Sequence, residues 1–235
     1  AQYAQRVERA IALLRDVAAT HPRLTQASSL GVEDVVVTHL ILLAGIRSRI
    51  FVLETGRLHP ETLALIPQIE QRYGRTIDRY HPVQEEVVHF VRTEGDDAMF
   101  RSVGLRKACC ELRKMEPLSR ALAGVDGWIT GLRREQSNAR AEAAEVVQEP
   151  SRVKVSPLVD WTWGDVWHFI AQHQLDYNAL HDQFFPSIGC EPCTRAISVG
   201  EDFRAGRWWW EQESAKECGL HVQPVGQSSP LKQPA

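Results

Sequence analysis

Five cysteines carry the most distinctive chemistry in this sequence. Cys109 and Cys110 are adjacent, Cys190 and Cys193 form a Cys-x-x-Cys pair, and Cys218 stands alone near the C-terminus. Two pairs of thiolates supply four soft ligands of the kind that zinc or an iron–sulfur cluster takes. An odd number of cysteines, in a chain of this size that does not open with a secretory signal, argues against a disulfide framework.

The tandem pair favours a centre larger than one metal ion. Zinc ribbons use two Cys-x-x-Cys pairs, whereas adjacent side chains on a helix point in different directions. Cys109 and Cys110 therefore need either an unusual local backbone or a centre that can be approached from two sides. We expect an iron–sulfur cluster, with zinc as the alternative and buried or disulfide-paired cysteines as the structural explanation.

Cys218 is the candidate nucleophile. A lone cysteine is more often a buried apolar residue than a nucleophile. Cys218, however, lies among charged and flexible residues (216–221, KECGLH), which is not the composition of a core strand. Lys216 and His221 would favour the thiolate and Glu217 would oppose it, and the sequence does not decide the balance.

Three turns that follow predicted strands carry groups suited to an anion. Residues 28–34 (SSLGVED) place hydroxyls, a glycine and free amides before a helix, residues 54–57 (ETGR) add a hydroxyl and a cation, and residues 131–134 (GLRR) add two more cations. An ordinary helix cap would also explain the first turn. No Gly-Lys-Ser/Thr follows it, which disfavours a P-loop kinase.

Alternating strands and helices position these turns. The hydrophobic pattern predicts strands over residues 24–27, 49–53, 76–80, 127–130 and 152–155. It predicts helices over residues 3–20, 32–44, 60–73 and 83–92, and another that is capped by Asp160 or Thr162 and runs to Phe169. Such alternation is typical of a parallel sheet covered on both faces. Ligands bind at the carboxyl ends of such strands, so all three turns could face one crevice.

Composition sets the class of protein. With 235 residues and 43% hydrophobic residues the chain is large enough for one α/β core. The net charge of −3 gives no general case for nucleic-acid binding. The longest apolar stretch, residues 35–45, is shorter than the ~20 residues that span a bilayer. We expect a cytoplasmic enzyme with neither a nucleic-acid nor a membrane partner.

Combined, the motifs resemble the assimilatory adenylyl-sulfate reductases, which form one family with the 3′-phosphoadenylyl-sulfate reductases. The resemblance covers about residues 24–221. It rests on residues 28–34, residues 54–57, the tandem cysteines with Arg113 and Lys114, residues 131–133, residues 190–193 (CEPC) and residues 217–221 (ECGLH). One departure is Glu54, where the family usually has Asp.

The resemblance implies a fold, a cofactor and a division of the chain. It implies a single α/β domain whose mostly parallel sheet is flanked by helices, Rossmann-like and similar to the adenine nucleotide alpha-hydrolases. It also implies a [4Fe–4S] cluster, not acting as a redox shuttle, on Cys109, Cys110, Cys190 and Cys193. We expect residues 1–200 to form the nucleotide-binding domain with the iron–sulfur site and residues 201–221 to form a substrate-closing segment with the catalytic cysteine. The proline-rich tail, residues 222–235, is expected to be disordered.

The implied reaction is that of an oxidoreductase of sulfate assimilation and cysteine biosynthesis. Cys218 attacks the sulfur of adenylyl sulfate, AMP leaves, and thioredoxin or a glutaredoxin-like dithiol releases sulfite from the S-sulfocysteine. The substrate is an anion, so cations are needed around it. The expected substrate-binding residues are Ser28, Ser29, Gly31, Thr55, Gly56, Arg57, Lys114, Arg133, Arg204, Arg207 and His221.

Other interpretations stay open. The 3′-phospho-specific enzymes generally lack the four cluster cysteines, which favours adenylyl sulfate over its 3′-phosphorylated form, although an enzyme for both substrates remains an alternative. An ATP pyrophosphatase or adenylyltransferase of the same superfamily would leave Cys218 unexplained. A non-enzymatic iron–sulfur protein, or a zinc-stabilised domain, would leave the anion-binding turns unexplained. The oligomeric state cannot be read from the sequence, and a homo-oligomer is possible.

Overall fold

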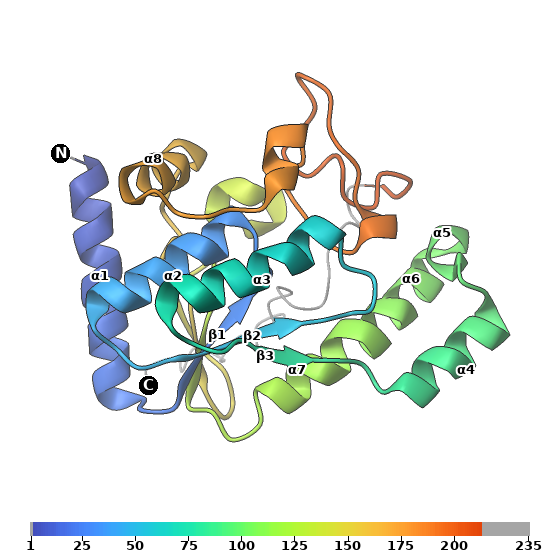
Figure 1. The fold of residues 1–235 in the computed structure, drawn as a ribbon, viewed down its shortest axis with the longest axis horizontal. Coiled ribbons are helices and arrows are strands. Elements are labelled where there is room, and N and C mark those ends of the chain that lie inside the picture. Colours follow the sequence, from blue (N-terminus) through green and yellow to red (C-terminus); the bar gives the residue numbers. More distant parts are fainter. Residues whose placement is uncertain (1, 213–235) are drawn as a thin grey trace, which may run out of the picture.

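A computed structural model describes residues 2–212 of the chain. The predictions made for Cys218, His221 and the tail at residues 222–235 therefore lie outside the described residues. Within the described part, one six-stranded sheet forms the centre of the molecule, in the order β3-β2-β1-β4-β6-β5 (Figure 1). The strands are β1 (Leu24–Ser28), β2 (Arg49–Leu53), β3 (Asp78–Tyr80), β4 (Gly127–Ile129), β5 (Val146–Gln148) and β6 (Val153–Val155).

The strand order creates a switch point between β1 and β4. From β1 the chain adds β2 and then β3 on one side, all parallel, and returns to place β4 on the other side of β1. β6 continues the parallel set, and only β5 runs antiparallel to its neighbour. In a sheet wound in both directions the connections diverge at this point, which opens a crevice at the carboxyl ends of β1 and β4.

Alternate side chains of the strands pack into two hydrophobic cores, one on each face of the sheet. Ile50 and Val52 of β2 point into the larger core, which lies under α1 (Gln2–Thr20), α2 (Val32–Ala44), α3 (Pro60–Tyr73) and α8 (Trp163–His173). Phe51 points to the opposite face and packs with Trp128 against α7 (Glu116–Ala121). This period of two is what a strand buried on both faces requires. α2 is buried almost all round, between α1 and α8.

A run of helices on the right of Figure 1 carries the tandem cysteines. α4 (Gln84–Glu94) leads through α5 (Ala98–Arg101) into α6 (Val103–Cys110), whose last two residues are Cys109 and Cys110. Residues Glu111–Met115 then form a π-helical turn before α7. A π-helical turn is rare and is frequent at functional sites. The two cysteines themselves lie in regular α-helix, and the unusual backbone directly follows them.

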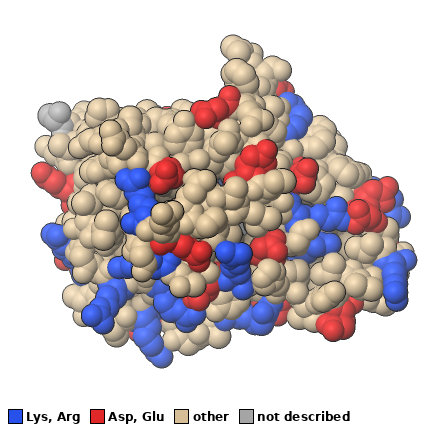
Figure 2. Space-filling view, in the orientation of Figure 1, with Lys and Arg blue, Asp and Glu red and all other residues tan. Residues whose placement is uncertain are grey.

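The remaining segments are short. Two 3₁₀ turns, Arg134–Gln136 and Asn138–Arg140, follow β4, and two more, Ala179–Gln183 and Glu191–Cys193, precede the last described residues. No helix within residues 2–212 is both long and apolar enough to cross a bilayer. Basic and acidic side chains are interspersed on the face drawn in Figure 2, in keeping with the small net charge.

The expected α/β fold with a mostly parallel sheet flanked by helices is confirmed. The predicted helices at residues 32–44 and 60–73 and the strand at residues 49–53 match their observed bounds. Several features were not predicted, among them the helices between residues 98 and 121. The β5 strand, Val146–Gln148, is short, and two of its three residues are exposed, so it lacks a hydrophobic pattern. The third strand begins at Asp78 rather than residue 76 because only its last three residues pair with β2.

A buried histidine in this core makes stability depend on pH. Burial, followed by the charges of His173 and Arg72, lowers the pKa of His39 to about 4, and its Nδ1 lies 3.1 Å from the Tyr73 hydroxyl. In the unfolded chain His39 binds a proton near pH 6.5, whereas in the folded protein it stays neutral until the pH approaches 4. Stability from neutral His39 is therefore complete above about pH 6.5 and is lost as the pH falls toward 4.

We expect this histidine to account for about 1–2 kcal/mol of the loss in unfolding free energy between pH 7 and pH 5. The His39→Gln variant should lose that part of the pH dependence in urea unfolding measured at both values. His89→Gln, at an exposed histidine, serves as the control and should retain the wild-type dependence. An unchanged pH dependence in His39→Gln would contradict the assignment.

Candidate active site

The main pocket lies at the carboxyl ends of β1, β2 and β4, at the switch point of the sheet. The turns after β1, β2 and β4 all contribute to its wall, as the sequence predicted. Its polar and charged lining includes Ser28, Ser29, Gly31, Glu33, Asp34, Thr55, Lys114, Gly131, Gln136, Arg140, His181, Arg204 and Arg207.

Asp34 ties the turn after β1 to the turn after β4. Its carboxylate accepts hydrogen bonds from the backbone N–H and the hydroxyl of Ser29, both at 2.6 Å, and from the N–H of Gly131 at 3.0 Å. Burial raises the pKa of Asp34 to about 6, against these hydrogen bonds, which favour the carboxylate. The sequence suggested that the amides of this turn would be free for an anion. The Ser29 amide instead already has an acceptor in Asp34.

Leu30 holds this turn in an uncommon conformation. Its φ of 62° lies in the left-handed region, where a side chain normally costs free energy. The Leu30 side chain is fully buried in the larger core. Its burial offsets the strain, so the apolar residue rather than Gly31, whose φ is −73°, sets the shape of the turn.

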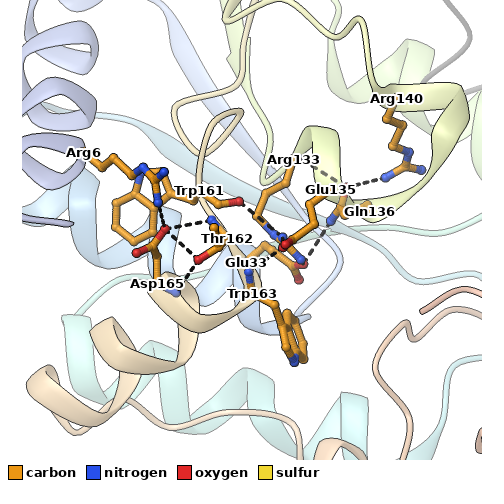
Figure 3. Close-up of polar contacts among 10 residues, drawn as sticks. All are labelled: Arg6, Glu33, Arg133, Glu135, Gln136, Arg140, Trp161, Thr162, Trp163 and Asp165. Carbon is orange, nitrogen blue, oxygen red and sulfur yellow. Dashed lines mark hydrogen bonds and ion pairs between the residues drawn. The ribbon is translucent and has the colours of Figure 1, made fainter. Parts of the chain in front are cut away.

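An ion-pair network centred on the buried Arg133 reaches the pocket wall at Glu33, Gln136 and Arg140 (Figure 3). Arg133 donates from Nε and Nη2 to Glu33 Oε1, at 3.2 and 2.9 Å, and from Nη1 to Glu135 at 2.8 Å. The amide of Gln136 donates to the same Glu33 oxygen, and Arg140 donates to Gln136. The Arg133 side chain is 1% exposed and is not part of the pocket wall. Its positive charge is thus balanced by carboxylates of the chain.

The four paired cysteines line one small cavity. Cys109, Cys110, Cys190 and Cys193 are all free, and the first, third and fourth are buried. The Cys190 sulfur lies 3.3 Å from the Thr55 hydroxyl, and a bridge between Leu58 and Cys190 joins the two segments. The structure thus brings together the two cysteine pairs that the sequence grouped, although 79 residues lie between Cys110 and Cys190.

Cations surround these thiols. Arg57, Arg106, Arg113 and Lys114 complete the wall of the cysteine cavity. Burial, together with the neighbouring Cys190, raises the pKa of Cys193 to about 11, while Lys114 and Arg207 act in the opposite direction. Arg113 donates to the Thr55 carbonyl at 2.7 Å, but its buried Nε finds no acceptor among the described residues. The donor set and its positive shell therefore fit an anionic thiolate-bound centre.

Within residues 2–212, no group of three or more His, Cys, Asp or Glu side chains is arranged to hold a single metal ion. A tetrahedral zinc needs its sulfurs about 2.3 Å from one point. A cluster of several irons is larger, and its thiolates stand farther apart. The four cysteines nevertheless share one cavity, and their thiols are the ligand type that either centre takes.

The cysteine cavity adjoins the main pocket. Lys114 and Cys190 line both. Arg204 and Arg207, both nearly buried, stand in the pocket wall, and their guanidinium groups lie 5.7 and 4.6 Å from the centre of the Trp208 ring. Arg207 donates to the Ile188 carbonyl at 3.3 Å, and its buried Nε has no acceptor among the described residues. Three cations thus meet where the two cavities join.

The turn after β2, residues 54–57, contributes little to the wall of the main pocket and mainly contacts neighbouring parts of the chain. Gly56 has a φ of 70°, and a side chain there would meet Arg113 at 3.3 Å. Its N–H donates to Glu54 Oε1 at 2.9 Å, so Glu54 caps its own turn. Arg57 pairs with Asp96 and faces the cysteine cavity rather than the main pocket. Of this turn only Thr55 lines the pocket.

Several pocket residues were not singled out from the sequence. His181 lines the pocket, and both its ring nitrogens are buried without a partner among the described residues. Gln136 and Arg140 follow the predicted GLRR turn but have no motif of their own. Of the three consecutive tryptophans, Trp208 and Trp210 pack beside the cysteines.

Comparison with protein families gives a match over residues 23–196 to the phosphoadenosine phosphosulfate reductase domain. The chain belongs to this family. Similar proteins include the adenosine 5′-phosphosulfate reductase of Burkholderia cepacia, 50% identical over 95% of this chain and 90% of that protein. The enzyme of the same name from Allochromatium vinosum is 50% identical over 96% and 89%.

Solved structures agree with this family. The phosphoadenylyl-sulfate reductase of Candida auris, in a phosphate complex, superimposes with a TM-score of 0.66 at 25% identity, over 80% of this chain and 90% of that one. The FMN adenylyltransferase of Candida glabrata shares the fold alone, with a TM-score of 0.56 at 11% identity over 95% and 80%. The phosphosulfate reductase family and the adenylyltransferases thus share this sheet.

The buried network around Arg133 leads to a prediction about stability. Replacing Arg133 by Met leaves Glu33 buried without its cation, which should lower the free energy of unfolding by about 3 kcal/mol. Arg134→Met is the matched control, because the Arg134 pair with Asp160 is about 40% exposed and should contribute less than about 1 kcal/mol. Urea unfolding of the two variants checks this. Equal losses of unfolding free energy in the two variants would show that the buried pair contributes no more to stability than the exposed one.

Proposed function

We propose that this member of the family reduces adenylyl sulfate to sulfite and AMP. The observation that carries the proposal is the junction of two cavities at Lys114 and Cys190. One cavity has the shape and position of a nucleotide site at a switch point, and the other holds four thiols. The cations at the junction suit a phosphosulfate group. The names of relatives that are 50% identical over most of the chain support the same reaction.

The proposed reaction has two steps. The Cys218 thiolate attacks the sulfur of adenylyl sulfate, an S–S bond forms, and the S–O bond breaks to release AMP. A dithiol protein of the thioredoxin or glutaredoxin kind then attacks the Cys218 sulfur and releases sulfite, and its second thiol resolves the mixed disulfide. Sulfur is reduced by two electrons, and the dithiol is oxidised to a disulfide by the same two.

The residues of the pocket would bind and orient the substrate. Lys114, Arg204 and Arg207 would balance the charge that develops on the leaving phosphate, because all three line the pocket and the two arginines are nearly buried, where water screens little. Ser28, Ser29, Gly31 and Thr55 would contact the nucleotide. Arg133 would act through Glu33, to which it donates hydrogen bonds. Gly56 would act by leaving room for the Arg113 side chain. Arg57 would face the cysteine cavity, and His221 lies outside the described residues.

A [4Fe–4S] cluster on Cys109, Cys110, Cys190 and Cys193 is part of this proposal. Four thiols in one cavity and a shell of cations support it. When bound, the cluster would supply a fixed anionic centre next to the substrate, without donating electrons. Lys114 would then lie between two anions, the thiolates and the sulfate, and hold both in place.

Two carboxylates favour the unphosphorylated nucleotide. Glu33 and Asp34 line the pocket, and their partners are already neutral amides, hydroxyls or Arg133. A 3′-phosphate adds about two negative charges to the ligand, and like charges at short range repel strongly in a buried site. Adenylyl sulfate is therefore the preferred substrate in this proposal, and its 3′-phosphorylated form is the alternative.

Two other functions have less support. An adenylyltransferase or ATP pyrophosphatase would explain the fold, which this chain shares with the FMN adenylyltransferase of Candida glabrata. It would not explain four thiols beside the pocket. A non-enzymatic iron–sulfur protein would not need cations in the pocket wall. We therefore keep the division of the chain into a nucleotide-binding body, residues 1–200, and a segment with the catalytic cysteine, residues 201–221.

The role of Cys218 is tested by its replacement with Ser. Protein purified without oxygen and mixed with adenylyl sulfate and thioredoxin should release sulfite, and Cys218→Ser should release none, because it lacks the attacking thiol. Mass spectrometry of the wild type, with thioredoxin omitted, should show a sulfonate on Cys218. The 3′-phosphorylated nucleotide is assayed in parallel. Sulfite release by Cys218→Ser at the wild-type rate would refute the proposal.

The cluster is tested by iron content. Cys190→Ala removes one of four proposed ligands and should lower bound iron and the visible absorption to near zero. Cys218→Ser is the matched control and should keep about four iron atoms per chain. Zinc bound in place of iron in anaerobically prepared wild type, or full iron in Cys190→Ala, would contradict the assignment of the four ligands.

A further inference from the structure

A buried ion pair joins the helix of the tandem cysteines to the end of the described chain. Arg106 lies in α6 and donates from Nε and Nη2 to the two oxygens of Glu211, at 3.0 and 2.7 Å. The two side chains are 1% and 2% exposed. Two parallel hydrogen bonds fix the relative orientation of a guanidinium and a carboxylate, which one contact does not.

Arg106 belongs to the cysteine site at the same time. It lines the cysteine cavity, and Cys110 contributes to its charge and hydrogen-bond surroundings. Its guanidinium also lies 4.7 Å from the centre of the Trp208 ring. Arg106 therefore contacts a cysteine, the tryptophan of the pocket wall and Glu211 together.

The segment that ends at Glu211 is held against its own backbone preference. Trp208 has a φ of 43°, in the left-handed region, which is a costly conformation for a bulky residue. Its N–H donates to the Cys193 carbonyl at 3.2 Å, and its carbonyl accepts from Glu211 at 2.8 Å. Such strain persists only where surrounding contacts over-determine it, and the Glu211 pair is the last of those contacts along the described chain.

We propose that the Arg106–Glu211 pair is a positioning device, which anchors residues 208–211 to the cysteine helix and thereby holds Arg207 and Trp208 in the pocket wall. This inference rests on the proposed function, in which Arg207 balances the charge that develops on the leaving phosphate. Without the pair, Arg207 and Trp208 would leave the wall more often, so the step that releases AMP would slow.

The test uses the iron-loaded enzyme and the variant Glu211→Gln, which keeps the shape of the side chain and removes its charge. Two rates are measured: single-turnover formation of the Cys218 sulfonate with adenylyl sulfate, and cleavage by trypsin after Arg207, which is 7% exposed in the anchored state. We expect sulfonate formation to slow about tenfold. We expect cleavage to speed up about tenfold, because the segment opens more often. Iron content should stay at the wild-type level.

Glu201→Gln is the matched control, since Glu201 forms an ion pair with Arg195 in the same part of the chain but at the surface. It should match the wild type in both rates. Arg106→Lys keeps the cation and loses the two parallel hydrogen bonds, so it should reproduce both effects of Glu211→Gln. Wild-type rates of both processes in Glu211→Gln or in Arg106→Lys would overturn the anchor.

The two proposals fail in different ways. If the wild type itself forms no sulfonate, the proposed function is wrong. The trypsin rates then decide the anchor alone: faster cleavage in Glu211→Gln than in Glu201→Gln supports it, and equal cleavage overturns it. A loss of bound iron in Glu211→Gln would also overturn the proposal, because it would mean that the cysteine site itself had collapsed.

Discussion

A buried guanidinium group must find an anion, and this constraint organises the site. Removing a cation from water costs several kcal/mol, which only good geometry and full hydrogen bonding recover. Arg133 meets the constraint with Glu33, and Arg106 meets it with Glu211. Each pair joins elements about a hundred residues apart in the sequence, so satisfying the charge also fixes the geometry of the pocket and of the cysteine cavity. Arg113 and Arg207 each keep a buried Nε without an acceptor in the described part of the chain. An anionic centre or substrate would complete their shells.

The parallel sheet explains why these charges meet at one place. The switch point between β1 and β4 separates the two connections and leaves a crevice, into which the turns after three strands project. Two residues beside that crevice, Leu30 and Trp208, adopt left-handed backbone conformations despite large side chains. Both side chains are almost fully buried, one in the main core and one beside the cysteines. Packing energy from the cores thus holds the walls of the pocket in shapes that the local sequence disfavours.

Much of this arrangement could be predicted from the sequence. Apolar periodicity located α2, α3 and β2 because buried elements carry strong patterns. The two cysteine pairs could be joined because the same soft ligand type occurs twice. The short β5 strand was not predicted because it is largely exposed. The start of β3 was placed wrongly because pairing with β2, rather than composition, sets where that strand begins. The hydrogen bond from the Ser29 amide to Asp34 could not be predicted. Glu33 and Asp34 are adjacent acids, and only the geometry of the first turn of α2 decides which carboxylate reaches the Ser29 amide. His181 has no motif at all and enters the pocket through tertiary packing.

Some buried arginines of the site are fully paired and others keep an Nε without an acceptor among the described residues. This difference explains how a chain of net charge −3 could bind the proposed anionic substrate. Long-range attraction from the whole surface is absent, and charges of both signs are interspersed on the face seen in Figure 2. Exposed charges are screened within about 10 Å at ordinary salt, whereas buried ones are not. Lys114, Arg204 and Arg207 line the pocket, and the two arginines are nearly buried. In the proposed function they would meet the anionic end of the substrate at contact distance. The carboxylates Glu33 and Asp34 line the same pocket, and Arg133, the Ser29 hydroxyl and backbone amides already pair with them. The negative charges of the pocket are therefore compensated within the chain, which leaves an anionic ligand to be met by the cations.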